Sequence, residues 1–198
     1  LKHDTNKLNV SVHESKHMSK EIWLNNIKVD ANKVLVLGDE DNFWQMGDTG
    51  PCGPCTEIYY DLGSKYDGVL PTEGDPKDRY IEIWNLVFTQ YNKTSSGNLE
   101  ELPQKCVDTG MGLERVQSIV EGLSDNYDSS TFLDLNNFID SKLNLKVKEK
   151  YVKKILLDHI RACCHLISDN VIPDREGRGY VLRRILRRSS RFIYKHNI

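Results

Sequence analysis

The sequence predicts an α+β protein in which strands come first and helices follow. Segments with the alternation or the β-branched and aromatic content of strands lie at 8–12, 34–37, 56–61 and 80–91. Beyond about residue 150, apolar side chains recur instead at helical spacing. A run of strands followed by a run of helices favours the α+β class.

The composition is that of a soluble globular protein, with 38% hydrophobic and 28% charged residues. No apolar run approaches the roughly 20 residues that span a bilayer, and no signal-peptide pattern opens the sequence. Five cysteines, an odd number, favour a reducing compartment, so we expect a cytoplasmic protein. Because Leu1 is not a methionine, we expect the sequence to begin inside a longer polypeptide.

The first predicted strand, at 7–12, alternates like a strand with one buried face. Directly after it stands an H-E-x-x-H pattern, formed by His13, Glu14 and His17. On a helix this spacing places two imidazoles and a general base around zinc. Here the stretch is polar and lacks an apolar wall. We therefore interpret it as the solvated start of a helix that continues through 19–26, and keep a zinc hydrolase as a remote alternative.

Residues 41–61 contain a block rich in turn residues. Three glycines and two prolines within 47–54 predict a shaped loop that leads into a strand at 56–61. Trp44, beside this loop, would provide a flat wall for a ligand. Cys52 and Cys55 form a C-x-x-C pair, but no second pair completes a tetrahedral zinc site, so we expect no metal there.

The longest predicted strand, 80–91, is rich in β-branched and aromatic residues. It follows an exposed connection at 62–78 and precedes a hairpin-like turn at 92–98. Its apolar residues do not keep one parity, which predicts a bulge or burial on both faces. Asn85 lies among them, and a buried amide there would need hydrogen-bond partners that a ligand could supply.

Residues 107–116 predict a strand end that turns through Gly110 and Gly112 into an amphipathic helix. Glycines allow a backbone and a ligand to approach closely. Asp108 offers a carboxylate for a cationic group, and Arg115 offers a planar fork for phosphate or a face for a base.

Two helices are predicted at 151–170 and about 178–196, after a charged linker at 144–150. Residues 171–198 carry eight basic and two acidic side chains, a net charge of +6. Residues 1–170 carry 19 basic and 27 acidic side chains, a net charge of −8. This polarity predicts that one end of the protein binds a polyanion.

Three stretches, 42–61, 82–90 and 107–116, resemble in their order and spacing the catalytic domain of the alanyl-tRNA synthetase family, which belongs to the class II aminoacyl-tRNA synthetases. The third stretch resembles motif 3 of that family, and 158–188 is similar to its adjoining helical tRNA-recognition region. The resemblance covers the chain from about residue 8.

This resemblance implies an antiparallel class II sheet with flanking helices over about 8–138, incomplete in this chain, and a helical portion from about 150. In domain terms, 1–140 would be the C-terminal part of the aminoacylation domain, and 150–198 would be part of the region that recognises the tRNA acceptor stem.

The resemblance also implies a site for ATP and L-alanine. ATP would be contacted by Trp44, Ile83, Trp84, Asn85, Gly112 and Arg115. Alanine would be contacted by Trp44, Asn85, Val87, Asp108 and Gly110. Asp108 would hold the ammonium group and Arg115 would meet bent ATP, so these two would be the catalytic residues. Mg²⁺ would accompany ATP, with Glu57 and Glu82 as candidate ligands, although a structural role is an equal alternative for either glutamate. Zinc is implied only for parts of full-length family members that this chain does not contain.

Contacts to tRNA(Ala) are implied for Arg175, Arg178, Arg184, Arg187, Arg188 and Arg191. Phosphate contacts of this kind position an RNA without reading its sequence. The family reads a G·U pair of the acceptor stem partly through an asparagine, and Arg175 stands at that position here. How this chain would read the pair stays open.

The function implied by the resemblance is that of an alanine–tRNA ligase, which activates alanine with ATP and transfers it to tRNA(Ala). Motif 1 and the motif 2 arginine would precede Leu1, and editing and C-terminal domains would follow Ile198. We therefore expect this chain to be a segment of such an enzyme, and to adenylate alanine poorly or not at all by itself. The alternative is a non-catalytic relative that binds tRNA or a protein partner, and ATP binding would distinguish the two.

Overall fold

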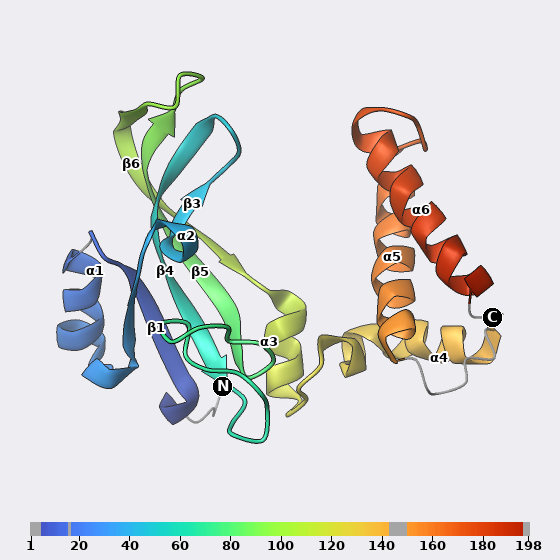
Figure 1. Cartoon of the computed structure of the whole chain (residues 1–198), viewed down its shortest axis with the longest axis horizontal. Helices are drawn as coiled ribbons and strands as arrows, with labels where there is room; N and C mark the ends of the chain where they lie inside the picture. Colours follow the sequence, from blue (N-terminus) through green and yellow to red (C-terminus); the bar gives the residue numbers. More distant parts are fainter. Residues whose placement is uncertain (1–4, 16, 143–149, 196–198) are drawn as a thin grey trace. The chain divides into compact units, whose positions relative to one another are not determined.

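The computed structural model describes residues 5–15, 17–142 and 150–195, without the side chain of His17. The chain divides after Ser124 into two compact units. The first unit contains the strands and the second contains helices, which confirms the predicted α+β class (Figure 1). The division comes earlier than the change expected between 140 and 150, because 125–142 already pack within the helical unit.

Six strands form one sheet within the described residues, in the order β2-β1-β4-β5-β6 with β3 paired to β4. The strands are β1 Leu8–His13, β2 Val34–Leu37, β3 Phe43–Gln45, β4 Gly50–Asp61, β5 Tyr80–Lys93 and β6 Leu99–Met111. β1 and β2 run parallel, and the other paired strands run antiparallel. β5 and β6 form a hairpin, closed by the turn that the sequence predicts at 92–98.

Short helical segments flank this sheet. They are η1 Thr5–Lys7, α1 His17–Glu21, η2 Ile22–Ile27, η3 Ala31–Lys33, α2 Asp39–Asn42 and α3 Leu113–Val120. On one face of the sheet, Trp23 of the π-helical turn η2 packs against Val10, Val12 and Val34, and its indole Nε1 donates to Thr56 Oγ1 at 2.9 Å. This apolar contact anchors the flanking helices to β1 and β4.

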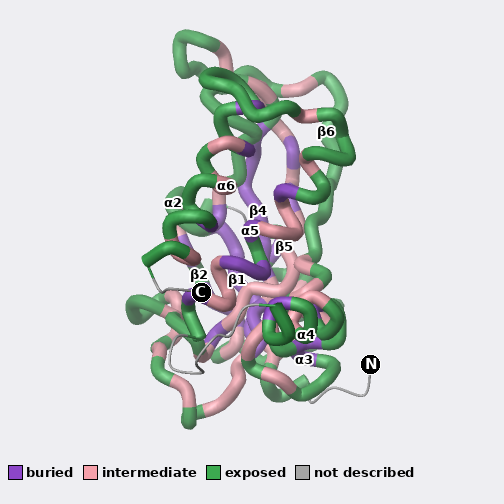
Figure 2. Tube along the Cα trace, turned by 90° about the vertical axis from the view of Figure 1, so that its right-hand side faces the viewer, coloured by how far each residue is buried: buried purple, intermediate pink, exposed green. Residues whose placement is uncertain are grey.

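β1 is buried on both faces, which corrects the expectation of one buried face. Its polar residues Asn9, Ser11 and His13 are as inaccessible as the valines between them. Asn42 of α2 is fully buried and donates to Ser11 Oγ at 2.8 Å and to the Cys55 carbonyl at 3.0 Å. Figure 2 shows the burial concentrated along β1 and β4. The second face therefore has a polar, hydrogen-bonded interior.

The predicted loop at 47–54 is shorter than expected, because β4 already begins at Gly50. The strand accommodates its glycines and prolines through a register shift between Cys52 and Cys55. A Cβ added at Gly53 would lie 2.0 Å from the Phe88 carbonyl oxygen of β5. Glycine is therefore required at this position by the close approach of the two backbones.

β6 is an edge strand among the described residues, and almost all of its side chains are exposed (Figure 2). Val107 is 61% exposed and Met111 is 47% exposed. The outer backbone groups of β6 are therefore not paired with another strand of the described residues.

The helical unit contains η4 Asn126–Asp128, η5 Ser130–Phe132, α4 Leu133–Lys142, α5 Lys150–Ser168 and α6 Gly177–Lys195. Its core is formed by Phe132, Ile139, Val152, Leu156 and Leu157. Both predicted helices are confirmed within a few residues of their bounds. The linker predicted at 144–150 lies outside the described residues except for Lys150, which begins α5. None of the described helices combines the length and apolarity needed to cross a bilayer.

Candidate functional site

The register of three antiparallel strands brings most of the predicted alanine-binding residues onto one face. Asn85 of β5 lies opposite Glu57 of β4 on one side and Gly110 of β6 on the other. Val87, two residues further along β5, lies opposite Asp108. Residues that pair directly share a face, and diagonal neighbours such as Asn85 and Asp108 lie about 7–8 Å apart. The four predicted residues therefore form one compact patch.

Trp84 is separated from this patch. It pairs with Ile58 of β4 and Met111 of β6. Because successive side chains of a strand point to opposite faces of the sheet, the Trp84 side chain lies on the face opposite to that of Asn85. The register shift between Ile58 and Tyr59 leaves Ile83 as the additional residue of β5, which confirms the predicted bulge. The side chains of Trp84 and Asn85 lie on opposite faces, so Trp84 would meet a ligand bound at Asn85 only through its backbone, and its ATP contact stays a prediction.

Asn85 has one satisfied end and one unsatisfied end. Its Nδ2 donates to Glu57 Oε1 at 3.1 Å. Its Oδ1 is buried and has no hydrogen-bond partner in the described part of the chain. A buried acceptor without a donor is destabilising, and such groups are rare in folded proteins. The patch therefore contains an acceptor that a ligand bearing N–H groups would satisfy.

Glu57 is buried beside Asn85 and is engaged at both oxygens. Tyr59 Oη donates to its Oε2 at 2.6 Å. Burial raises the pKa of the Glu57 carboxyl to about 7, the hydrogen bond from Tyr59 opposes this rise, and the nearby carboxylates of Glu82 and Asp41 add to it. Glu57 is buried and each of its oxygens already accepts one protein hydrogen bond, so it is less available to Mg²⁺ than an exposed carboxylate; its role as a ligand stays a prediction.

Gly110 and Asp108 both adjoin open space. A Cβ added at Gly110 would meet no atom within 4 Å. The side chain of Asp108 is exposed, and its Oδ1 accepts the Thr109 N–H at 2.8 Å. The carboxylate and the free space thus lie next to the unsatisfied Asn85 acceptor. However, Gly110 lies inside β6 and not in a turn, so the predicted two-glycine turn is reduced to Gly112.

Arg115 is held at the junction between β5 and α3. Gly112 precedes the first residue of α3, and its N–H donates to the Ile83 carbonyl at 3.1 Å. Arg115 Nη1 donates to the Glu82 carbonyl at 2.7 Å and lies 3.3 Å from Glu82 Oε2, while its side chain stays 46% exposed. An added Cβ at Gly112 would crowd the Arg115 side chain at 3.2 Å. This glycine therefore leaves room for the guanidinium stem.

The carboxylate of Glu82 fits a nucleotide-bound Mg²⁺ better than Glu57 does. No group of three or more His, Cys, Asp or Glu side chains that could enclose a metal exists within the described residues. Mg²⁺ that accompanies a nucleotide is commonly held by one or two carboxylates together with phosphate oxygens. Glu82 is 36% exposed and adjoins Arg115, so it is accessible to such an ion.

Trp44 lies on β3 opposite Gly53 and is 38% exposed. Its backbone hydrogen-bonds the thiol of Cys55, whose pKa is raised to about 12, chiefly by burial. Cys52 and Cys55 are both free thiols that are buried in β4. Burial raises the pKa of both thiols and keeps them protonated, and the expectation that they hold no metal stays a prediction.

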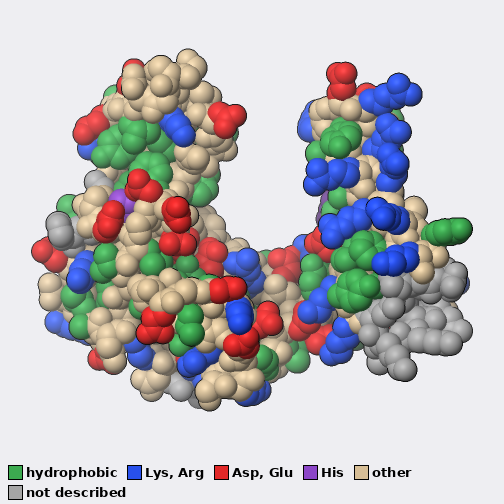
Figure 3. Space-filling view, viewed as in Figure 1, with side chains coloured by type: hydrophobic (Ala, Val, Ile, Leu, Met, Phe, Trp, Pro, Cys, Tyr) green, Lys and Arg blue, Asp and Glu red, His purple; other side chains and the backbone are tan. Residues whose placement is uncertain are grey.

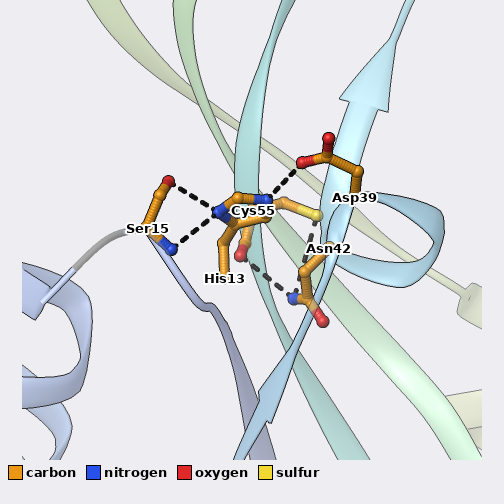
Figure 4. A network of polar contacts seen from close by, with 5 residues as sticks. All are labelled: His13, Ser15, Asp39, Asn42 and Cys55. Carbon is orange, nitrogen blue, oxygen red and sulfur yellow. Dashed lines mark hydrogen bonds and ion pairs between the residues drawn. The ribbon is translucent and has the colours of Figure 1, made fainter.

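Among the described residues of the H-E-x-x-H pattern, only His17 lies on a helix, so the predicted helix through 19–26 exists but begins later than expected, and the single helix face that the zinc alternative requires is not formed. His13 ends β1, and α1 begins only at His17, whose side chain lies outside the described residues. His13 is buried, and Ser15 and Asp39 engage its two ring nitrogens at 2.7 Å each (Figure 4). The Ser15 N–H donates to Nδ1, so Nε2 carries the proton and donates to Asp39. His13 therefore has no free nitrogen for zinc.

The predicted polyanion-binding arginines cluster on α6 in the helical unit. A cavity of about 400 Å³ is lined by Tyr180, Arg183, Arg184, Arg187, Arg188 and Arg191. Among the described residues, none of these arginines forms an ion pair with an acidic side chain. Figure 3 shows basic side chains gathered along the helical unit. Arg175 and Arg178 are exposed just before and within the first turn of α6, outside this cavity.

The sequence interpretation missed the polar residues that support the patch. Asn42 donates a hydrogen bond to Ser11, and Tyr59 donates one to Glu57. The sequence interpretation singled out none of Ser11, Asn42 and Tyr59. A signal did exist, because polar residues keep one parity along β1 and apolar residues keep the other. A strand with this pattern can have a buried polar face instead of a solvated one.

The whole chain, residues 1–198, matches the family model described as tRNA synthetases class II (A). Similar curated relatives are the alanine–tRNA ligases of Nitrosomonas europaea, 48% identical over 190 residues, and of Sulfurimonas denitrificans, 48% identical over 201 residues. They match 96% and 98% of this chain, respectively. The enzyme of Nitrosospira multiformis is 46% identical over 196 residues, which again represent 98% of the chain.

The chain spans 22% to 23% of the length of these relatives. The sheet, its candidate site and the helical unit all fall within the family match. The resemblance inferred from the three stretches is confirmed, and the chain belongs to the class II (A) tRNA synthetase family.

Proposed function

We propose that this chain provides the alanine-binding face and part of the ATP site of an alanine–tRNA ligase, together with a surface for the acceptor stem of tRNA(Ala). The observation that carries the proposal is the buried, unsatisfied Asn85 Oδ1. It lies beside the Asp108 carboxylate and the open space at Gly110. A small amino acid has an ammonium group, which would bind the Asn85 acceptor and the Asp108 carboxylate, and a short side chain, which would fit the open space at Gly110. The names of the relatives support the same substrate.

The proposed chemistry is an in-line displacement at phosphorus. A carboxylate oxygen of alanine attacks the α-phosphorus of ATP, and the bond from that phosphorus to the pyrophosphate oxygen breaks, giving alanyl-adenylate and pyrophosphate. A ribose hydroxyl of tRNA(Ala) then attacks the carbonyl carbon and releases AMP. The carboxylate is already a nucleophile, so no general base is required. Positioning and electrostatic stabilisation are the contributions expected of the protein.

Each residue has a proposed role in this reaction. Asp108 and Asn85 bind the ammonium group, and Val87 forms a wall of the side-chain pocket. Arg115 meets the nucleotide at the end of the patch, where its guanidinium neutralises phosphate charge. Mg²⁺, held by Glu82 together with phosphate oxygens, would supply further charge neutralisation. Trp44, Ile83 and Gly112 are proposed as additional walls, and Trp84 as a contact through its backbone.

The arginine-lined cavity of α6 is proposed as a phosphate-contacting surface. A row of guanidinium groups that form no ion pair with the acidic side chains of the described residues suits the closely spaced phosphates of an RNA helix. Arg175 and Arg178 would extend the contact beyond the cavity. All five cysteines are free thiols, which supports a reducing, cytoplasmic location.

The alanine site is tested by a Gly110→Ala variant of the polypeptide that carries these residues. No atom lies within 4 Å of the added methyl group, so folding should be unaffected. The methyl group would occupy substrate space, and we expect the KM for alanine to rise about 10-fold or more in alanine-dependent ATP–pyrophosphate exchange. The thermal midpoint should stay within about 2 °C of the wild type.

An unchanged KM for alanine in this variant would refute the placement of the amino acid. If the wild-type polypeptide bound tRNA(Ala) but neither ATP nor alanine, the chain would be a non-catalytic relative and the ligase proposal would fail.

The RNA surface is tested by an Arg184→Ala/Arg187→Ala variant. Both side chains are exposed and line the cavity. Losing two phosphate contacts should weaken binding of a tRNA(Ala) acceptor-stem duplex about 10-fold and reduce the slope of log K against log salt by about 2. Fluorescence anisotropy across a salt series provides the measurement. A Lys20→Ala/Lys105→Ala variant, which removes two exposed charges from the sheet unit, is the matched control and should leave the slope unchanged.

A further inference from the structure

The amide of Asn85 is held in a single orientation by its neighbour. When Glu57 is ionised it can only accept hydrogen bonds, so the end of Asn85 that faces it must be the NH₂ group. Because burial raises the pKa of Glu57 to about 7, this orientation is enforced above that pH. The 3.1 Å contact from Asn85 Nδ2 to Glu57 Oε1 agrees with this requirement. The carbonyl end, Oδ1, is then directed away from Glu57 and is the atom left without a partner.

Glu57 is itself fixed from several sides. Tyr59, on the same strand, donates to its second oxygen. Ser11 of β1 accepts the Glu57 backbone N–H at 3.2 Å, and the Ser11 hydroxyl is fixed in turn by Asn42. These contacts leave the carboxylate little freedom to turn away from Asn85.

We propose that Glu57 is a positioning residue of the alanine site: its carboxylate orients the Asn85 amide so that Oδ1 faces the ligand, which makes the site selective for a cationic amino group. The inference rests on the proposed function, since it assigns a further residue to the same site. Glu57 does not touch the substrate and acts through Asn85. A reversed amide would present NH₂ donors to the ammonium group and repel it.

The position of Glu57 in the sheet is unfavourable for stability and is explained by this role. Burial disfavours its ionised form, and the carboxylates of Glu82 on β5 and Asp41 in α2 add repulsion. Tyr59 and Ser11 oppose these effects through hydrogen bonds. A residue that served only packing would not need a charge here, whereas an obligate acceptor for Asn85 does.

The test compares two ligands that differ only in the amino group, the alanyl and propionyl sulfamoyl adenosines. Their affinities are measured by calorimetry on the polypeptide that carries these residues, as the wild type and as Glu57→Gln. The glutamine amide has a single acceptor atom, for which Tyr59 and Asn85 compete, and its own NH₂ group can donate to Asn85 Oδ1. We expect affinity for the alanyl compound to fall about 10-fold and affinity for the propionyl compound to change less than about 2-fold.

Two matched variants separate positioning from a general structural effect. Tyr59→Phe removes one support of Glu57 but keeps the carboxylate and its Asn85 contact, so it should reduce the preference for the alanyl compound less than Glu57→Gln does. In an Asn85→Ala background, Glu57→Gln should have no further effect on the ratio of the two affinities. Because the buried carboxylate is unfavourable, Glu57→Gln should keep or raise the thermal midpoint. If it does not fold, Glu57→Asp, which withdraws the carboxylate from Asn85, replaces it in the same comparison.

The outcomes distinguish the inference from the proposed function. Equal losses for both compounds in Glu57→Gln, or an additive effect in the Asn85→Ala background, would overturn the role of Glu57 alone. Failure of both compounds to bind the wild type would overturn the proposed function as well. A selective loss for the alanyl compound that is larger in Glu57→Gln than in Tyr59→Phe supports the role.

Discussion

An Asp108→Asn variant is expected to lose at least about 100-fold in kcat/KM for alanine, because it removes the anion that binds the substrate ammonium. The side chain is exposed in β6, and its hydrogen bond to the Thr109 N–H can be kept by the amide oxygen of asparagine. The fold should therefore be unchanged. The measurement is alanine-dependent ATP–pyrophosphate exchange by the polypeptide that carries these residues.

A suitable control for this variant lies on the same strand. Glu100 is exposed in β6, pairs with Asn92 and lies away from the candidate patch. Glu100→Gln removes the same charge and should leave kcat/KM within about 2-fold of the wild type. Similar losses in both variants would mean that net charge, and not a specific contact at Asp108, governs the rate.

Replacing Gly53 with alanine is expected to cost about 3 kcal/mol or more of the free energy of unfolding of the sheet unit. The added Cβ would lie 2.0 Å from the Phe88 carbonyl oxygen, and a backbone atom cannot move aside as a side chain can. Overpacking of this kind typically costs about 1–3 kcal/mol, and more when the neighbour is fixed. β4 and β5 would have to separate around the register shift, which also weakens the support of Asn85 by Glu57.

Urea unfolding followed by tryptophan fluorescence measures this loss in the 198-residue chain. All three tryptophans, at positions 23, 44 and 84, belong to the sheet unit, so the signal reports on that unit. Gly110→Ala serves as the control, since its added methyl group meets no atom. A midpoint for Gly53→Ala equal to that of the control would show that the close approach of β4 and β5 is not required.

Local patterns of the sequence were sufficient to predict the elements but not their neighbours. The helices near 151–170 and 178–196 follow directly from apolar spacing, and the strand at 80–91 follows from its β-branched content. The loop predicted at 47–54 was too long because glycine and proline usually interrupt strands. In the structure, pairing with β5 at an irregular register keeps this segment extended. Tertiary pairing overrides local preference at such positions.

Part of the candidate site could be predicted from the sequence, and part could not. Asn85, Asp108 and Gly110 were identified from the residue types and the family resemblance, and the register places them together. Side chains alternate along a strand, which places Trp84 on the face opposite to Asn85. The bulge at Ile83 interrupts this alternation, so the sequence did not reveal which residues of the strand share a face. The contact between Glu57 and Asn85 depends on which strands pair, and a single sequence does not reveal pairing.

The hairpin topology of β5 and β6 has a consequence for the order in which the protein folds. Asn85, Val87, Asp108 and Gly110 all lie on this hairpin, so they can meet once a short turn closes. Isolated hairpins form in about 1–10 µs, whereas contacts between more distant segments wait for a larger loop to close. Glu57 arrives only with β4, across the long connection at 62–79. We therefore expect the ammonium-binding residues to assemble early and Asn85 to gain its final orientation in a later folding step.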